Sequence, residues 1–146
     1  MSARSRKSAI AAKAWQLFFD FFISTRNERD RSLERRKLTP NDNRALMSLE
    51  RQPGKTMGTL AREWHCDASN ATWIVDRLER LGFAERKLSP TDRRVKLVVL
   101  TTPGARAQSE IMKEFRTPPP GFLRLQRADL QALVEVLRKL AGPPRR

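Results

Sequence analysis

The chain has 146 residues, and its 30 lysines and arginines against 16 acidic residues give a net charge of +14, which favours a polyanionic partner, above all nucleic acid. Its single cysteine excludes an intramolecular disulfide and a cysteine-based metal cluster, so we expect no metal and no cofactor. We find no signal peptide and no apolar run near the roughly 18 residues of a membrane span, and we therefore expect a cytoplasmic protein without membrane contact.

A long helix is predicted from Ala9 to about Arg36, because this stretch lacks proline and glycine and its apolar residues return at helical spacing. Its apolar face carries Ile10, Ala14, Trp15, Phe18, Phe19, Phe22 and Ile23. Such a face should be buried against a second chain or against the rest of this one. Dimer or core packing is its simplest role. The alternative is an effector pocket, lined by Trp15, Phe18, Phe19 and Phe22.

Three shorter helices are predicted next. The first runs from Pro40 to about Gln52, the second follows Thr56 and ends before a turn at His65 and Cys66, and the third covers about 68–81. Thr39, Thr56 and Asp67 supply their N-caps, and Gly82 suits the residue after the third helix.

A hairpin and two more helices complete the chain. Strands are predicted at 83–87 and 95–101, joined by a charged turn over 89–94. Thr102 should cap a helix that starts at Pro103 and continues to about Phe115, before the prolines at 118–120 interrupt it. The last helix, at about 127–141, carries an apolar stripe of Leu130, Leu133, Val134, Leu137 and Leu140. The fold class is therefore mainly α with a small β-hairpin wing.

Two short helices joined by a tight turn and followed by a hairpin form a winged helix-turn-helix, whose second helix enters the major groove of DNA. If Ala71, Ile74, Val75 and Leu78 face inward, the DNA-binding candidates are Ser69, Asn70, Thr72, Trp73 and Arg77. Asn70 suits adenine and Trp73 suits thymine methyl groups. A phase slip of one residue would instead place Trp73 in the core, and an ordinary exposed face is the alternative for the whole group.

The turn between the strands contains the wing candidates Asp92, Arg93 and Arg94. Arginine side chains suit the negative potential of the minor groove. A solvated hairpin loop is the alternative, but the position between two strands, directly after the second motif helix, favours the wing.

These residues resemble the MarR family of bacterial regulators. The matches are Leu60-Ala61 at the start of the first motif helix, V-D-R-L-E-R-L-G-F over 75–83, and the wing D-R-R followed by L-x-x-L-T. The spacing Asp92-x-Arg94 is the most specific of them. Leu38-Thr39-Pro40 and the T-P-G after the second strand extend the resemblance to about two thirds of the chain.

The resemblance implies a two-fold dimer in which the first and last helices interlock. The segments 1–37 and 102–146 would then form a dimerisation module around a DNA-binding lobe at 38–101. It also implies that Arg94 enters the minor groove and that Asp92 and Arg77 form a polar brace. The chain departs from the family at Trp73, where a basic or small polar residue is common, and at the proline break over 118–121.

The sequence thus predicts a transcriptional regulator, in the first instance a repressor, that binds a pseudo-palindromic duplex as a homodimer. Release by a small-molecule or oxidant signal is an added hypothesis, with Cys66 as the redox candidate. A non-specific architectural DNA-binding protein is the alternative. We do not expect an enzyme, because the sequence has no nucleophile paired with a base, no glycine-rich phosphate loop and one histidine.

Overall fold

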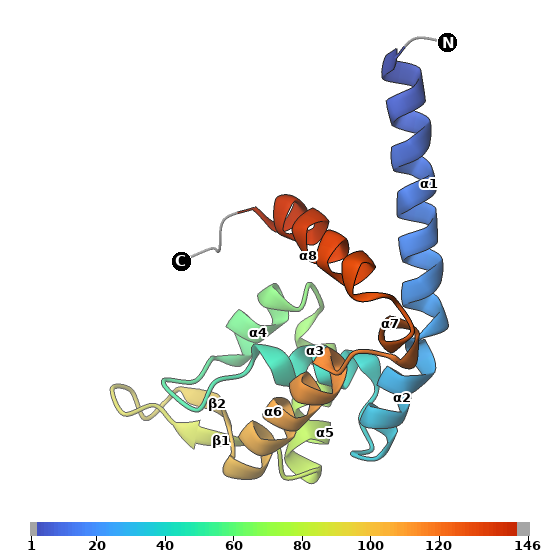
Figure 1. Ribbon diagram of the computed structural model, residues 1–146. Coiled ribbons are helices and arrows are strands. Elements are labelled where there is room, and N and C mark those ends of the chain that lie inside the picture. The colour runs from blue at the N-terminus through green and yellow to red at the C-terminus, as the bar shows by residue number, and fades with distance from the viewer. Residues whose placement is uncertain (1–2, 143–146) are drawn as a thin grey trace. The chain divides into compact units, whose positions relative to one another are not determined.

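The computed structural model describes residues 3–142 (Figure 1). Its helices are α1 (Ala3–Ser24), α2 (Arg26–Glu34), α3 (Pro40–Ser48), α4 (Met57–Glu63), α5 (Ala68–Arg80), α6 (Thr102–Arg116), α7 (Pro120–Leu123) and α8 (Arg127–Ala141), and its strands are β1 (Ala84–Leu88) and β2 (Lys96–Leu100). The chain divides into two compact units, Met1–Glu114 and Phe115–Arg146. Among the described helices, none has the length and apolar character needed to cross a bilayer. The fold class is as predicted.

The prediction of one helix over 9–36 is wrong, because the helix breaks at Thr25 and begins as early as Ala3. Ser24 and Thr25 donate side-chain hydrogen bonds to the carbonyls of Phe21 and Phe22, at 2.8 and 3.0 Å. Arg29 also donates to the Phe22 carbonyl, at 2.7 Å. These side chains satisfy carbonyl groups at the end of α1, so that the next helix can start in a new direction.

The helix α3 ends at Ser48, four residues before the predicted end at Gln52. Leu49 is extended and buried, with 2% of its surface exposed. Beyond it the chain follows the sheet, where Lys55 exchanges two backbone hydrogen bonds with Val98, at 2.8 and 3.0 Å. Burying Leu49 and pairing with β2 stabilises the fold more than another helical turn would. Local helix propensity contains no information about this contact with β2.

The strands β1 and β2 form an antiparallel hairpin in which Ala84 pairs with Leu100 and Leu88 with Lys96. Figure 1 shows the hairpin projecting from the helices of the first unit. The largest fully buried apolar side chains in the core of this unit belong to Leu46, Leu60, Ile74, Val75, Leu78, Val98 and Ile111.

The helix α6 begins at Thr102, but its cap is Thr101 rather than the predicted Thr102. The Thr101 hydroxyl accepts a hydrogen bond from the Gly104 N–H, at 3.0 Å, and donates to the Gly82 carbonyl, at 2.6 Å. One residue therefore joins the start of α6 to the turn after α5.

The second unit contains α7 and α8. The short helix α7 was not predicted, and it starts because Pro119 is extended and Pro120 occupies the first turn, where a proline lacks no needed hydrogen bond. The helix α8 has the predicted bounds. Its stripe residues remain accessible, with Leu137 40% and Leu140 78% exposed.

Candidate nucleic-acid interface

The helix α5 is amphipathic in the predicted phase. Its N-cap Asp67 accepts a hydrogen bond from the Asn70 N–H, at 2.7 Å. The inward residues Ala71, Ile74, Val75 and Leu78 are each at most 1% exposed. Burying these apolar side chains holds α5 on the core and fixes which face points outward.

The outward face of α5 brings together four of the five predicted recognition residues. Ser69, Asn70, Thr72 and Trp73 are all exposed. The Trp73 side chain is 52% exposed, so the alternative in which it belongs to the core is wrong. The face therefore combines hydrogen-bonding groups with one large indole.

The end of α4 is held against α3 by contacts around Trp64, which is buried. The indole N–H of Trp64 donates to the Ser48 hydroxyl, at 2.8 Å, and Arg44 donates to the Trp64 carbonyl, at 3.0 Å. His65 then turns the chain with a φ of +53° and remains exposed, as expected for the turn. This left-handed turn is what makes the connection between α4 and α5 tight.

Arg77 differs from the other recognition candidates in its partner, because it pairs with the buried Asp42 of α3. Its Nε and Nη2 donate to the Asp42 carboxylate at 2.9 to 3.2 Å, and Nη2 also donates to the Lys37 carbonyl at 3.1 Å. The predicted brace between Arg77 and Asp92 is therefore wrong. The competing partner is Asp42, which no local sequence signal identifies as a neighbour of α5.

Asp42 is fully buried and has two functions in the fold. Its carboxylate accepts from the Thr39 N–H at 2.8 Å, which forms a capping box at the start of α3. Burial raises the pKa of Asp42, but hydrogen bonds from Arg77 and Thr39 lower it by a larger amount. The net pKa therefore lies below the ordinary value. The charged carboxylate is thus compensated at its buried position.

The contact that ties the wing to α5 is made by Arg86 of β1, and sequence reasoning missed it. Arg86 forms ion pairs with Asp76, at 2.8 Å, and with Glu79, and its backbone N–H donates to Glu79 at 2.9 Å. Both acids belong to the V-D-R-L-E-R segment of α5. An acidic pair on this helix followed by an arginine in the next strand was the available signal.

At the tip of the wing, Asp92 supports its own turn. Its carboxylate accepts from the Arg94 N–H, at 2.9 Å, as in an Asx-turn. Arg93 and Arg94 are exposed, and within residues 3–142 neither side chain forms an ion pair. The wing tip therefore presents two uncompensated cations to solvent.

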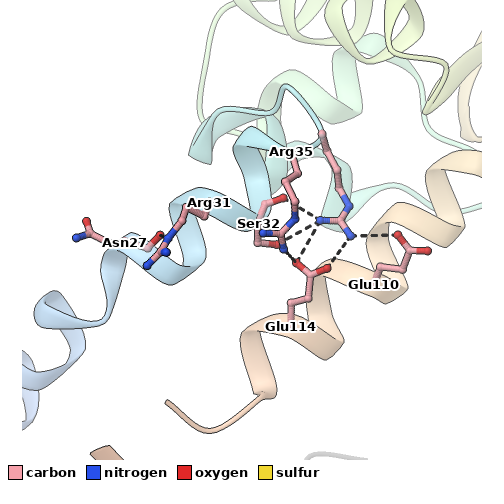
Figure 2. Close-up of polar contacts among 7 residues, drawn as sticks. Asn27, Arg31, Ser32, Arg35, Glu110 and Glu114 are labelled. Carbon is pink, nitrogen blue, oxygen red and sulfur yellow. Dashed lines mark hydrogen bonds and ion pairs between the residues drawn. The ribbon is translucent and has the colours of Figure 1, made fainter. Parts of the chain in front are cut away.

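The arginines that follow α2 differ from those of the wing tip, because Arg35 and Arg36 are paired with acidic residues. Figure 2 shows Arg35, Glu110 and Glu114 gathered in this cluster. Arg36 donates to Glu114 at 2.8 and 3.2 Å and to Glu110 at 3.0 Å, and Arg35 donates to Glu114 at 2.8 Å. Hydrogen bonds with Arg36 and Ser32, together with the charges of Arg36 and Arg35, lower the pKa of Glu114 to about 2. This cluster joins α2 to α6.

The remaining candidates lie outside this face. Trp15, Phe18, Phe19 and Phe22 of α1 are all exposed, so they do not pack in the core of the described chain. The rings of Trp15 and Phe18 stack at 5.9 Å, and Arg29 lies 4.0 Å from the centre of the Phe22 ring. Cys66 is a partly exposed free thiol at the turn after α4. Within the described residues, no group of acidic, histidine and cysteine side chains is arranged to hold a metal ion.

Two helices joined by a tight turn, with the second presenting a polar face beside a projecting hairpin, define a winged helix-turn-helix protein. Residues 38–96, from Leu38 to the start of β2, match the sequence model of the MarR family. This match confirms, over residues 38–96, the resemblance to the MarR family that the motifs of the second helix and the wing predicted.

The curated relatives are regulators. The chain is 31% identical over 104 residues to the proposed transcriptional regulatory protein for the hcr operon of Thauera aromatica, a match covering 70% of this chain and 63% of that protein. It is 29% identical over 102 residues to YcgE of Bacillus subtilis, an uncharacterized HTH-type transcriptional regulator, with coverage of 70% and 66%. The chain thus spans slightly less than two thirds of each relative.

Three of the solved structures with the same fold come from Listeria monocytogenes, Bacillus subtilis and Staphylococcus aureus. The MarR protein of Listeria monocytogenes aligns with a TM-score of 0.78 at 15% identity, over 92% of this chain and 94% of that one. YusO of Bacillus subtilis aligns with a TM-score of 0.72 at 25% identity, over 97% and 98%. A complex of Staphylococcus aureus MepR with DNA aligns with a TM-score of 0.65 at 22% identity, over 84% and 99%.

Proposed function

We propose that this protein is a transcriptional regulator, in the first instance a cytoplasmic repressor, that binds a pseudo-palindromic duplex operator as a homodimer. The observation that carries the proposal is the outward face of α5, whose polar residues stand exposed on a helix fixed from behind by four buried ones. A helix with this form fits the major groove, where base edges are distinguishable.

In this proposal Ser69, Asn70 and Thr72 contact bases or phosphates, and Arg94 enters the minor groove from the wing. Asp92 holds the turn that presents Arg93 and Arg94. The net charge of +14 supports a large phosphate contribution to affinity, so binding should weaken steeply with added salt.

The dimer would be formed by the segments 1–37 and 102–146, around a DNA-binding lobe at 38–101. The exposed aromatic side chains of α1 and the exposed stripe of α8 support this assignment, because apolar surfaces of this extent are typical of interfaces. Two lobes related by a two-fold axis would place their recognition helices about 10 base pairs apart.

The relatives support the same function. Two regulators share about 30% of their residues with this chain over 70% of its length. MepR, which has the same fold, was solved bound to DNA.

Regulation by a signal is part of the proposal. A small molecule bound near Trp15, Phe18, Phe19 and Phe22 would change the spacing of the two lobes and so disfavour the DNA-bound state. An oxidant acting on Cys66 is the second route. Peroxide should then weaken operator binding by the wild type and leave Cys66→Ser unaffected.

A selection of bound sequences from a random duplex library tests the function. We expect an enriched inverted repeat, bound more tightly than random duplex, and a dimer on a calibrated sizing column. Equal affinity for all sequences would contradict the operator and support the alternative, an architectural DNA-binding protein.

A further inference from the structure

The outward face of α5 contains one side chain that hydrogen bonding to DNA does not explain. Trp73 is the one aromatic residue of α5, and it lies 52% exposed beside the polar residues Asn70 and Thr72. Exposing an indole to water is costly, and a folded lobe with a complete core gains nothing from it. This side chain therefore calls for an apolar partner.

Trp73 is held in place by its neighbour one helical turn later. The guanidinium carbon of Arg77 lies 5.4 Å from the centre of the Trp73 ring, within the range of a cation–π contact. Arg77 is fixed in turn by its bonds to Asp42 and to the Lys37 carbonyl. A buried carboxylate of α3 thus orients an exposed indole on α5 through one arginine.

The same bonds make Arg77 unsuited to reading a base. Bidentate recognition of guanine requires two donors of one guanidinium to point at the base edge. The Nε and Nη2 groups of Arg77 already donate to Asp42 and Lys37. Arg77 is therefore placed to position Trp73 rather than to contact guanine.

We propose that Trp73 recognises a thymine through its C5 methyl group, and that Arg77 and Asp42 are positioning residues for this contact. The thymine methyl is the apolar group that base pairs present in the major groove, so it is the natural partner for an indole there. The inference rests on the proposed function, because it assumes that α5 lies in the major groove.

Replacing thymine by deoxyuridine tests the contact, since it removes the methyl group and keeps the pairing. Each thymine of the selected operator is replaced in turn, in both half-sites, and affinity is measured by fluorescence anisotropy. For the wild type we expect one position per half-site at which the loss is about fourfold, the value for burying one methyl group. Trp73→Ala should bind more weakly and show no loss at that position.

The positioning role is tested by the same ratio of thymine to uracil affinity. Arg77→Lys keeps the charge but loses the planar fork, and Asp42→Asn keeps an acceptor for the Thr39 N–H but loses the ion pair. Both should reduce the fourfold ratio towards one while circular dichroism still reports a folded protein. The matched control is Arg80→Lys, since within residues 3–142 Arg80 donates only to the Asp76 carbonyl of its own helix. Its ratio should equal that of the wild type.

The outcomes separate this inference from the proposed function. A protein that selects an operator but binds its uracil forms as tightly as its thymine forms overturns the role of Trp73 alone. A fourfold loss that persists in Trp73→Ala assigns the methyl contact to another residue and also overturns it. An unchanged ratio in folded Arg77→Lys and Asp42→Asn overturns the positioning role. Failure to select any sequence contradicts the proposed function instead.

Discussion

The lobe built from α3, α4, α5 and the hairpin differs from α1 in where its apolar side chains lie. In the lobe, Leu46 and Leu60 are completely buried, whereas Trp15 and Phe18 of α1 are 65% and 52% exposed. The lobe also buries a charged group, because the carboxylate of Asp42 is fully buried and paired with Arg77. The lobe therefore completes its own core within one chain, and α1, like α8, requires a further surface.

The largest effect should come from placing a charge in the exposed apolar stripe of α8. Leu137→Asp puts a carboxylate in the α8 stripe, and burying it unpaired in a dimer costs roughly several kcal/mol. We expect monomers on a sizing column and loss of operator binding, and the same for Leu133→Asp. Ala132→Asp is the control, because Ala132 is exposed on the same helix but lies off the stripe.

A Leu137→Asp variant that stays dimeric would refute the assignment of α8 to the interface. A variant that becomes monomeric while the lobe keeps its melting temperature would sharpen the comparison, because it would separate the stability of the lobe from that of the dimer.

The lobe itself should be intolerant of added volume. A Cβ at Gly104 of α6 would lie 2.0 Å from the Phe83 carbonyl oxygen and 2.9 Å from Leu100. Gly104→Ala should therefore lower the free energy of unfolding by about 3 kcal/mol in urea denaturation. Gly58→Ala is the control, because the nearest atom to its Cβ would be 4.0 Å away, and alanine there should raise stability by up to about 1 kcal/mol. Equal effects of the two changes would mean that α6 packs less closely on the hairpin.

Local sequence signals predicted the lobe well because they act within one or two turns. The period of Ala71, Ile74, Val75 and Leu78 determined the phase of α5, and Thr56 and Asp67 cap their helices as expected. The distant partners were not predictable in this way. Asp42 is 35 residues from Arg77, and a composition or spacing rule does not distinguish it from Asp92 as the partner.

The ends were harder to predict for a related reason. Apolar periodicity identified helices over 9–36 and 127–141 but contains no signal for the break at Thr25, which depends on side chains of Ser24 and Arg29 bonding to carbonyls. The same periodicity indicates that an apolar face must be covered, and leaves open which surface covers it.

The wing tip offers a third way to test the comparison, because Arg93 and Arg94 are exposed and form no ion pair within residues 3–142, whereas Arg77 and Arg86 elsewhere in the lobe are paired with acids. Arg94→Ala should weaken operator binding about tenfold, the usual effect of losing one arginine that enters a groove. Thermal unfolding should not change, because the Arg94 side chain supports no described contact of the fold.

The control is Arg106→Ala on α6, which removes the same charge from another exposed position. Equal losses for both would mean that the charge matters and the position does not, and an unchanged affinity for Arg94→Ala would contradict the placement of the wing.

The smallest effect should come from the cluster that joins α2 to α6, which lies outside the lobe. The folded pKa of Glu114 is about 2, below its ordinary value of 4.5, so its ionised form stabilises the fold. That contribution is complete above pH 4.5 and is lost as the pH falls towards 2. Because the carboxylate is about one third exposed, we expect Glu114→Gln to cost about 1 kcal/mol at neutral pH. The difference from the wild type in urea denaturation should shrink between pH 4.5 and 2.

The control is Glu110→Gln, which removes the more exposed acid and a single bond to Arg36 and should therefore cost less stability. A pH-independent difference for Glu114→Gln would mean that the cluster joins α2 to α6 by packing rather than by charge.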